Sequence, residues 1–146
     1  MYLIKQEYMS DIKKRIILIT YLGLIPFYFP LFIKLLGLEF SHDKIINFEK
    51  LHLIYGSMIV AFLSGMQWQK IINYKIKNQL ILPIIPLILV AFFGNNDFLN
   101  HSFLILIFSL FLSLLIDLLF LKKVNDLWFI KLRINATILA ILSYLI

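Results

Sequence analysis

YGSMIVAFLSGMQW, residues 55–68, is the stretch that decides the fold of this chain. It is predominantly apolar, as a membrane-spanning helix must be, and small residues recur in it at every fourth position. Helices in lipid gain little from burying apolar surface against each other, so close approach of two backbones is a main source of association. We therefore predict a membrane-spanning helix with a helix-packing face, around which the other helices assemble. The face comprises Gly56, Ser57, Ala61, Ser64 and Gly65.

The composition extends this interpretation to the whole chain. Of its 146 residues 62% are hydrophobic, and the mean hydropathy is +0.93, whereas soluble domains are closer to half apolar. About 20 apolar residues cross a bilayer, and five such segments occupy almost the entire sequence. The predicted fold class is all-α, an integral membrane bundle of five transmembrane helices.

The predicted domains are a basic cytoplasmic N-terminal segment, residues 1–15, and a five-helix membrane domain, residues 16–146. The segment MYLIKQEYMSDIKKR has the composition of a short amphipathic helix lying on the membrane surface. The predicted spans cover about 16–37, 51–70, 79–93, 102–121 and 127–146.

Prolines distinguish the first and third of these spans. Pro26 and Pro30 each remove a backbone donor and should bend the first span, and neighbouring groups must then satisfy the freed carbonyls. The third span carries Pro83 and Pro86 and is short, since fifteen helical residues cover only about 22 Å. It must thin the bilayer locally or include the polar residues before it.

The distribution of basic residues predicts the orientation. With the N-terminus inside, eleven Lys and Arg residues fall on the inner side and three on the outer side, which is the bias that the positive-inside rule describes. Trp68 and Trp128 then lie at the inner interface as aromatic anchors. We predict the N-terminus inside, the C-terminus outside, and contacts between the basic loops and anionic lipids at the inner face.

Three motifs resemble one known family. They are YLGLIPF in the first span, YGSMIVAFLSGMQW in the second and WFIKLRINATILAIL in the fifth. Together they are similar to the family catalogued as domain of unknown function 3429, whose eukaryotic members are called transmembrane protein 69. The resemblance implies a small multi-pass protein of the bacterial or mitochondrial inner membrane, and it implies no activity.

The sequence departs from that family's pattern at four positions. Ala61 stands where the pattern has Ser, Ser64 where it has Gly, Gln67 where it has His, and Phe129 where it has Tyr. If the histidine of the relatives carries chemistry, Gln67 cannot supply its protonation or its strong metal ligation.

Asp117 is the acidic residue well inside a predicted span, and intramembrane carboxylates face protein or water and need a partner. It lies five residues before Lys122, about 7–8 Å along a helix. Arg133 lies at a similar depth in the fifth span, beyond the short KKVND turn. We predict an Asp117–Arg133 ion pair, with bidentate geometry as one option. It acts as a structural clasp, which we favour, or as part of a proton or ion path; the third alternative is that the charged side chains simply snorkel to the interface.

Other groups that carry chemistry are sparse. His42, His52 and His101 fall on the predicted outer side, where we expect solvated loop residues and helix caps. Glu49 and His52 have the Glu-x-x-His spacing of di-metal bundles, but one copy is too few. The chain has no cysteine and no phosphate-loop, dinucleotide or hydrolase motif. We expect no cofactor, no metal and no nucleic-acid partner.

These observations favour a protein that is not an enzyme. The expected function is a structural or assembly partner of a larger membrane complex, binding other membrane proteins or itself. The first alternative is a small transporter or channel-like protein with Asp117 on its path. The second is a lipid-active membrane enzyme that uses the outer histidines and carboxylates.

Overall fold

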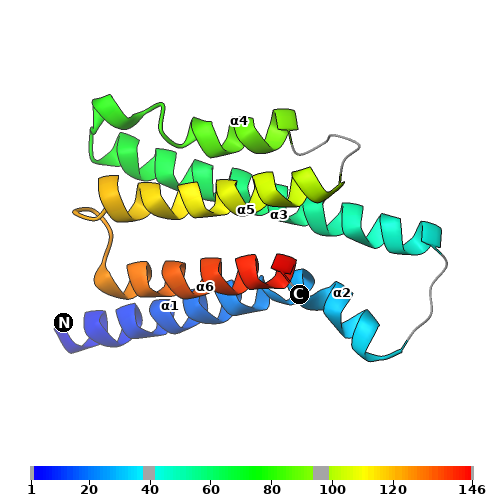
Figure 1. Ribbon diagram of the computed structural model, residues 1–146. Helices are drawn as coiled ribbons and strands as arrows, with labels where there is room; N and C mark the ends of the chain where they lie inside the picture. Colours follow the sequence, from blue (N-terminus) through cyan, green and yellow to red (C-terminus); the bar gives the residue numbers. More distant parts are fainter. Residues whose placement is uncertain (1, 38–41, 94–98, 146) are drawn as a thin grey trace.

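The computed structural model describes residues 2–37, 42–93 and 99–145, and the regular elements in these ranges are all helical (Figure 1). They are α1 (Tyr2–Leu22), α2 (Ile25–Leu35), α3 (His42–Asn73), the 3₁₀ turn η1 (Lys77–Gln79), α4 (Ile84–Phe93), α5 (Leu99–Leu115), the π-helical turn η2 (Ile116–Phe120) and α6 (Leu127–Leu145). The predicted all-α class is confirmed.

The helices run roughly along one common axis and alternate in direction (Figure 1). Helices α3 and α5 pack together in the middle of the bundle, α4 packs on both of them, α6 packs on α5, and α1 lies against α6. The core that joins them is apolar. It consists of Leu24, Phe27, Leu53, Val60, Leu63, Val90, Leu106, Leu110, Ala136 and Ala140.

Four of the helical segments are long and apolar enough to cross a membrane. They are Asp11–Ile33, Asn47–Asn73, Ser102–Phe120 and Leu127–Leu145. The segment predicted at 79–93 forms α4, whose ten residues measure about 15 Å. Together with η1, it runs beside α3 and α5 along much of the bundle (Figure 1). The protein is a small multi-pass membrane protein.

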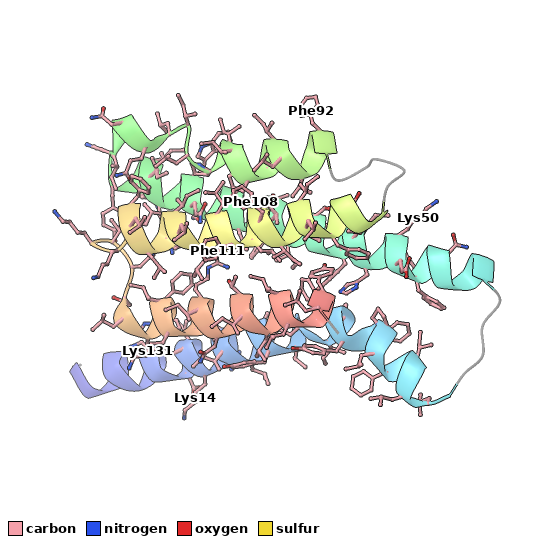
Figure 2. The ribbon with its side chains drawn as sticks, viewed as in Figure 1. Lys14, Lys50, Phe92, Phe108, Phe111 and Lys131 are labelled. Carbon is pink, nitrogen blue, oxygen red and sulfur yellow. The ribbon has the colours of Figure 1, made fainter. Side chains whose placement is uncertain are left out.

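One end of the bundle is rich in cations. We call it the basic end; it holds the turn after α3, the turn between η2 and α6, and the N-terminal half of α1 (Figure 1). Lys14 and Lys131 lie toward this end, whereas Lys50 lies toward the opposite one (Figure 2). The described side chains at this end also include Lys13, Lys70, Lys75, Lys122 and Lys123.

The first span is broken rather than bent, and the break precedes the prolines. Helix α1 runs without interruption from Tyr2 to Leu22, so residues 2–15 continue directly into the first span. It ends at Gly23–Leu24, and Pro26 falls in the first turn of α2, where a missing backbone donor costs little. The hydroxyl of Tyr55 donates a 2.6 Å hydrogen bond to the carbonyl of Gly23 and so satisfies a group that the break frees.

The five residues of the predicted packing face of α3 differ in burial within the single chain. Gly56 and Ser64 are buried and Ser57 is half-buried, but Ala61 and Gly65 are exposed. The buried face of α3 follows Gly56, Ser64 and Gln67 instead. A buried amide needs a partner, and α3 is turned so that Gln67 meets α5, which leaves Ala61 and Gly65 on the outside.

Candidate functional site

The ionisable residues of the bundle interior meet near the basic end. Arg133 and Asp117 are both buried, and the Arg133 Nε donates to the Asp117 Oδ2 at 2.9 Å. The structure therefore brings together the two residues that the sequence analysis paired. The contact is single rather than bidentate, because the Arg133 Nη2 points to the Ser113 hydroxyl, 3.4 Å away.

A wide helical turn positions the carboxylate. Residues Ile116–Phe120 form the π-helical turn η2, in which the amide of Leu121 bonds the carbonyl of Ile116 at 3.2 Å. This wider turn buries the consecutive residues Ile116 and Asp117 together with Leu121. Single π turns inside α-helices are frequent at functional sites. Here the turn places one carboxylate among apolar neighbours and level with Arg133.

Polar side chains from α3 and from the turn before α6 complete the cluster. Gln67 donates to the backbone carbonyl of Ser113 at 2.8 Å and contacts its hydroxyl at 3.2 Å. The Asn125 amide nitrogen makes long contacts to the carbonyl and the carboxylate of Asp117, at 3.4 and 3.5 Å. Lys70 reaches the Asn125 amide oxygen at 2.5 Å, which joins α3 to the same cluster. We call these residues the polar clasp: Gln67, Lys70, Ser113, Asp117, Asn125 and Arg133.

The sequence analysis placed two of the six residues of the polar clasp, Asp117 and Arg133, and missed a row of serines behind it. Ser102, Ser109 and Ser113 lie at intervals of seven and four residues on one face of α5, and each is fully buried. Their spacing in an otherwise apolar helix was the signal that could have found them. Small hydroxyl residues let α5 approach its neighbours closely, and this is the packing role that we had assigned to α3 alone.

His52 is not the solvated residue that we expected. Helix α3 begins at His42, nine residues before the predicted start of the span, so His52 lies well inside the helix and on its buried face. Its ring stacks on Tyr144 at 4.1 Å and lies edge-on to Phe27 at 5.9 Å. The Tyr144 hydroxyl donates to the backbone carbonyl of His52 at 3.1 Å. This aromatic group ties α2, α3 and α6 together at the end opposite the polar clasp.

Both tryptophans lie near the basic end. The Trp68 indole donates to the carbonyl of Leu80 at 2.7 Å, and the Trp128 indole donates to the carboxylate of Asp126 at 3.0 Å. The Lys13 ammonium lies 5.6 Å from the Trp128 ring and so contacts α6 from α1. Their role as interface anchors stays a prediction.

The part of the chain that the structure describes contains no group of three potential metal-ligating side chains. The side chains of His42 and His101 lie outside the described residues. Within the polar clasp the Asp117 carboxylate faces two donors and the Gln67 amide nitrogen donates to Ser113. The buried Gln67 amide oxygen has no hydrogen-bond partner among the described residues. Such an arrangement fixes the positions of the helices relative to one another. It gives less support to a catalytic role.

An apolar cavity of about 440 Å³ lies beside the clasp, between α1, α3 and α6. Its walls are formed by residues such as Ile19, Leu63, Leu132 and Ala136, and Arg133 lies where the cavity meets the clasp.

Comparison with known proteins agrees with this all-helical membrane architecture. The pattern of the family described as a protein of unknown function, DUF3429, matches residues 12–146, which include all of the polar clasp. No curated protein and no solved structure matches the chain. Because the match covers nearly the whole sequence, the chain belongs to the DUF3429 family.

Proposed function

We propose that this protein is a structural or assembly partner of a larger complex in a bacterial or mitochondrial inner membrane. The observation that carries the proposal is that the buried charges of the bundle are paired with each other. Asp117 is buried and bonded to Arg133, and Gln67, Lys70, Ser113 and Asn125 surround the pair. An intramembrane carboxylate whose contacts all serve packing supports a clasp between α3, the α5–η2 helix and α6.

A transport path through Asp117 is supported less well. Such a path needs a polar cavity that reaches the carboxylate near the middle of the membrane. Within the described residues, the cavity beside the clasp has mainly apolar walls, and it is lined by Arg133 and not by Asp117. The geometry therefore favours the structural function.

The exposed small residues of α3 offer a surface for a partner helix. Ala61 and Gly65 lie one turn apart on the outer face, and a methyl group added at Gly65 would meet no atom within 4 Å. Small residues at that spacing allow close helix–helix approach in lipid. The concentration of cations at the basic end supports an orientation with that end, and the N-terminus, inside.

The test is gentle-detergent purification from the native membrane, with mass spectrometry of the proteins that copurify. Ala61→Leu enlarges the exposed face of α3, whereas Ala91→Leu makes the same change at an exposed position of α4. We expect a partner that is present in stoichiometric amount with the parent protein and with Ala91→Leu, and that is depleted with Ala61→Leu.

Two results would contradict the proposal. One is a protein that purifies without a stoichiometric partner and accumulates normally in cells that lack every candidate. The other is solute flux in vesicles reconstituted with the purified protein alone, abolished by Asp117→Asn, which would establish the transport alternative.

A further inference from the structure

The cavity between α1, α3 and α6 has mainly apolar walls and a few polar side chains. Its walls carry the apolar side chains of Ile16, Ile19, Phe62, Leu63, Met66 and Leu132. Its volume of about 440 Å³ falls within the range of small-molecule sites, roughly 300–1,000 Å³. Helix α1 forms one wall and packs mainly against α6. The wall that α1 forms is weakly buried, since Ile16 and Ile19 are exposed.

Two polar side chains, one helical turn apart on α6, lie in this lining. Thr137 is 3% exposed, and its hydroxyl makes no hydrogen bond to any described residue. Arg133 is 8% exposed, and of the five N–H donors of a guanidinium two are used, by Asp117 and Ser113. The remaining donors and the Thr137 hydroxyl are thus available to an acceptor inside the cavity.

The cavity has a direction relative to the membrane. On α6 its lining runs from Phe129 to Ala140, about 16 Å at the helical rise and close to half the roughly 30 Å hydrocarbon core. Arg133 lies in the half nearer the basic end, and side chains on a helix lean toward its N-terminus, which for α6 is also the basic end. Arg133 is therefore the polar lining residue nearer one membrane surface, and Thr137 lies one helical turn deeper, with apolar lining on both sides of the two.

Exposed positive charge lies at that surface. Lys14, Arg15 and Lys131 are exposed, on the two helices that border the cavity near its polar part. The charge of Arg133, in contrast, is balanced by Asp117. A ligand that fits both the balanced charge of Arg133 and the exposed cations has an uncharged hydrogen-bond acceptor at the depth of Arg133. It also has an anionic group closer to the membrane surface.

We propose that this cavity binds one acyl chain of an anionic glycerophospholipid from the leaflet at the basic end. The ester carbonyl accepts hydrogen bonds from Arg133 and Thr137, the chain runs toward Ala140, and the phosphate group contacts the exposed basic residues. The site shares Arg133 with the polar clasp, but its test uses the cavity wall and Thr137 and does not involve the outer face of α3 on which the test of the assembly function depends.

The experiment uses the full-length protein in phosphatidylcholine vesicles that contain a trace of phosphatidylglycerol with a photoactivatable group at the end of one acyl chain. Labelled peptides are located by mass spectrometry. We expect saturable labelling near Phe27 and Ala140, with unlabelled phosphatidylglycerol competing about tenfold better than phosphatidylcholine.

Matched variants test the apolar and polar parts separately. Ile19→Trp projects into the cavity and should reduce labelling about tenfold, whereas Leu18→Trp, on the neighbouring exposed position outside the lining, should not. Thr137→Val should weaken labelling about threefold. Thr20→Val is its control, because the Thr20 hydroxyl already bonds the carbonyl of Ile16 at 2.8 Å.

The proposal is overturned if labelling is not saturable, or if phosphatidylcholine or an isoprenoid quinone competes as well as phosphatidylglycerol. Unchanged labelling of Ile19→Trp also overturns it. If that variant does not fold, Ile16→Trp replaces it at the same wall with the same expectation.

Discussion

At the scale of single residues, the pairing of Asp117 with Arg133 predicts a strong non-additive effect. Removing one partner leaves the other charge buried without compensation, and Asp117→Leu or Arg133→Met alone should lower the free energy of unfolding by about 3–5 kcal/mol. The double variant Asp117→Leu/Arg133→Met removes both charges and should recover more than half of that loss. Reversible unfolding in mixed micelles measures all three.

Lys131→Met is the control for this cycle, because Lys131 is an exposed cation on the same helix and its loss should change stability little. Additive losses in the double variant would show that the two side chains act separately, and the clasp would then have no energetic basis.

The ion pair could be predicted from the sequence because the prediction needed only the distance of each residue from the turn that joins the two helices. Asp117 and Arg133 lie at comparable distances from one short turn, so antiparallel helices bring them level. The π-helical turn that aims the carboxylate was not predictable, since it depends on burying Ile116 and Asp117 together. Gln67 and Lys70 were not assigned to the cluster, because residues on a distant helix carry no signal of which neighbour they will meet.

At the scale of helices, the contact of α3 with α5 and α6 predicts opposite outcomes at two glycines of one helix. A methyl group at Gly56 would overlap the Tyr144 hydroxyl and the Leu106 side chain, so Gly56→Ala should cost about 1–3 kcal/mol of stability. At Gly65 it would meet open space, and Gly65→Ala should change stability by less than about 1 kcal/mol, in the stabilising direction. Thermal unfolding in detergent compares the two; equal losses would place both glycines at packed interfaces.

The same two glycines show why only part of the predicted packing face is buried within the chain. A repeat of small residues at every fourth position identifies a narrow side of a helix, but it does not say whether that side meets another helix or lipid. The rotation of α3 is set by the residues that are most costly to leave in lipid, and Gln67 is one of them. Its requirement for a partner on α5 outweighs the small gain from packing Ala61 and Gly65.

At the scale of the whole molecule, the fold class followed from composition because a chain this apolar has few stable forms other than a helical bundle. The path of the chain through the membrane is a separate question, and it depends on the short helix α4. If residues 77–93 cross, the turn after α3 and the turn before α6 lie on the same side. If they do not, those turns lie on opposite sides. The structure places both turns at the basic end (Figure 1).

The absence of cysteine from the sequence makes this path directly measurable, since every introduced thiol is read without background. Single cysteines are placed at Asn73, the last residue of α3, at Lys122 before α6, and at Lys50 near the opposite end, all of them exposed. With a maleimide that cannot cross membranes, we expect Lys50→Cys to react in intact cells. Asn73→Cys and Lys122→Cys should react only in inverted vesicles, because the positive-inside rule retains the basic end inside. Denatured samples of each variant, in which all three thiols must react, control for accessibility. Reaction of Lys122→Cys together with Lys50→Cys in intact cells would mean that α4 turns back within the membrane and that the chain crosses four times.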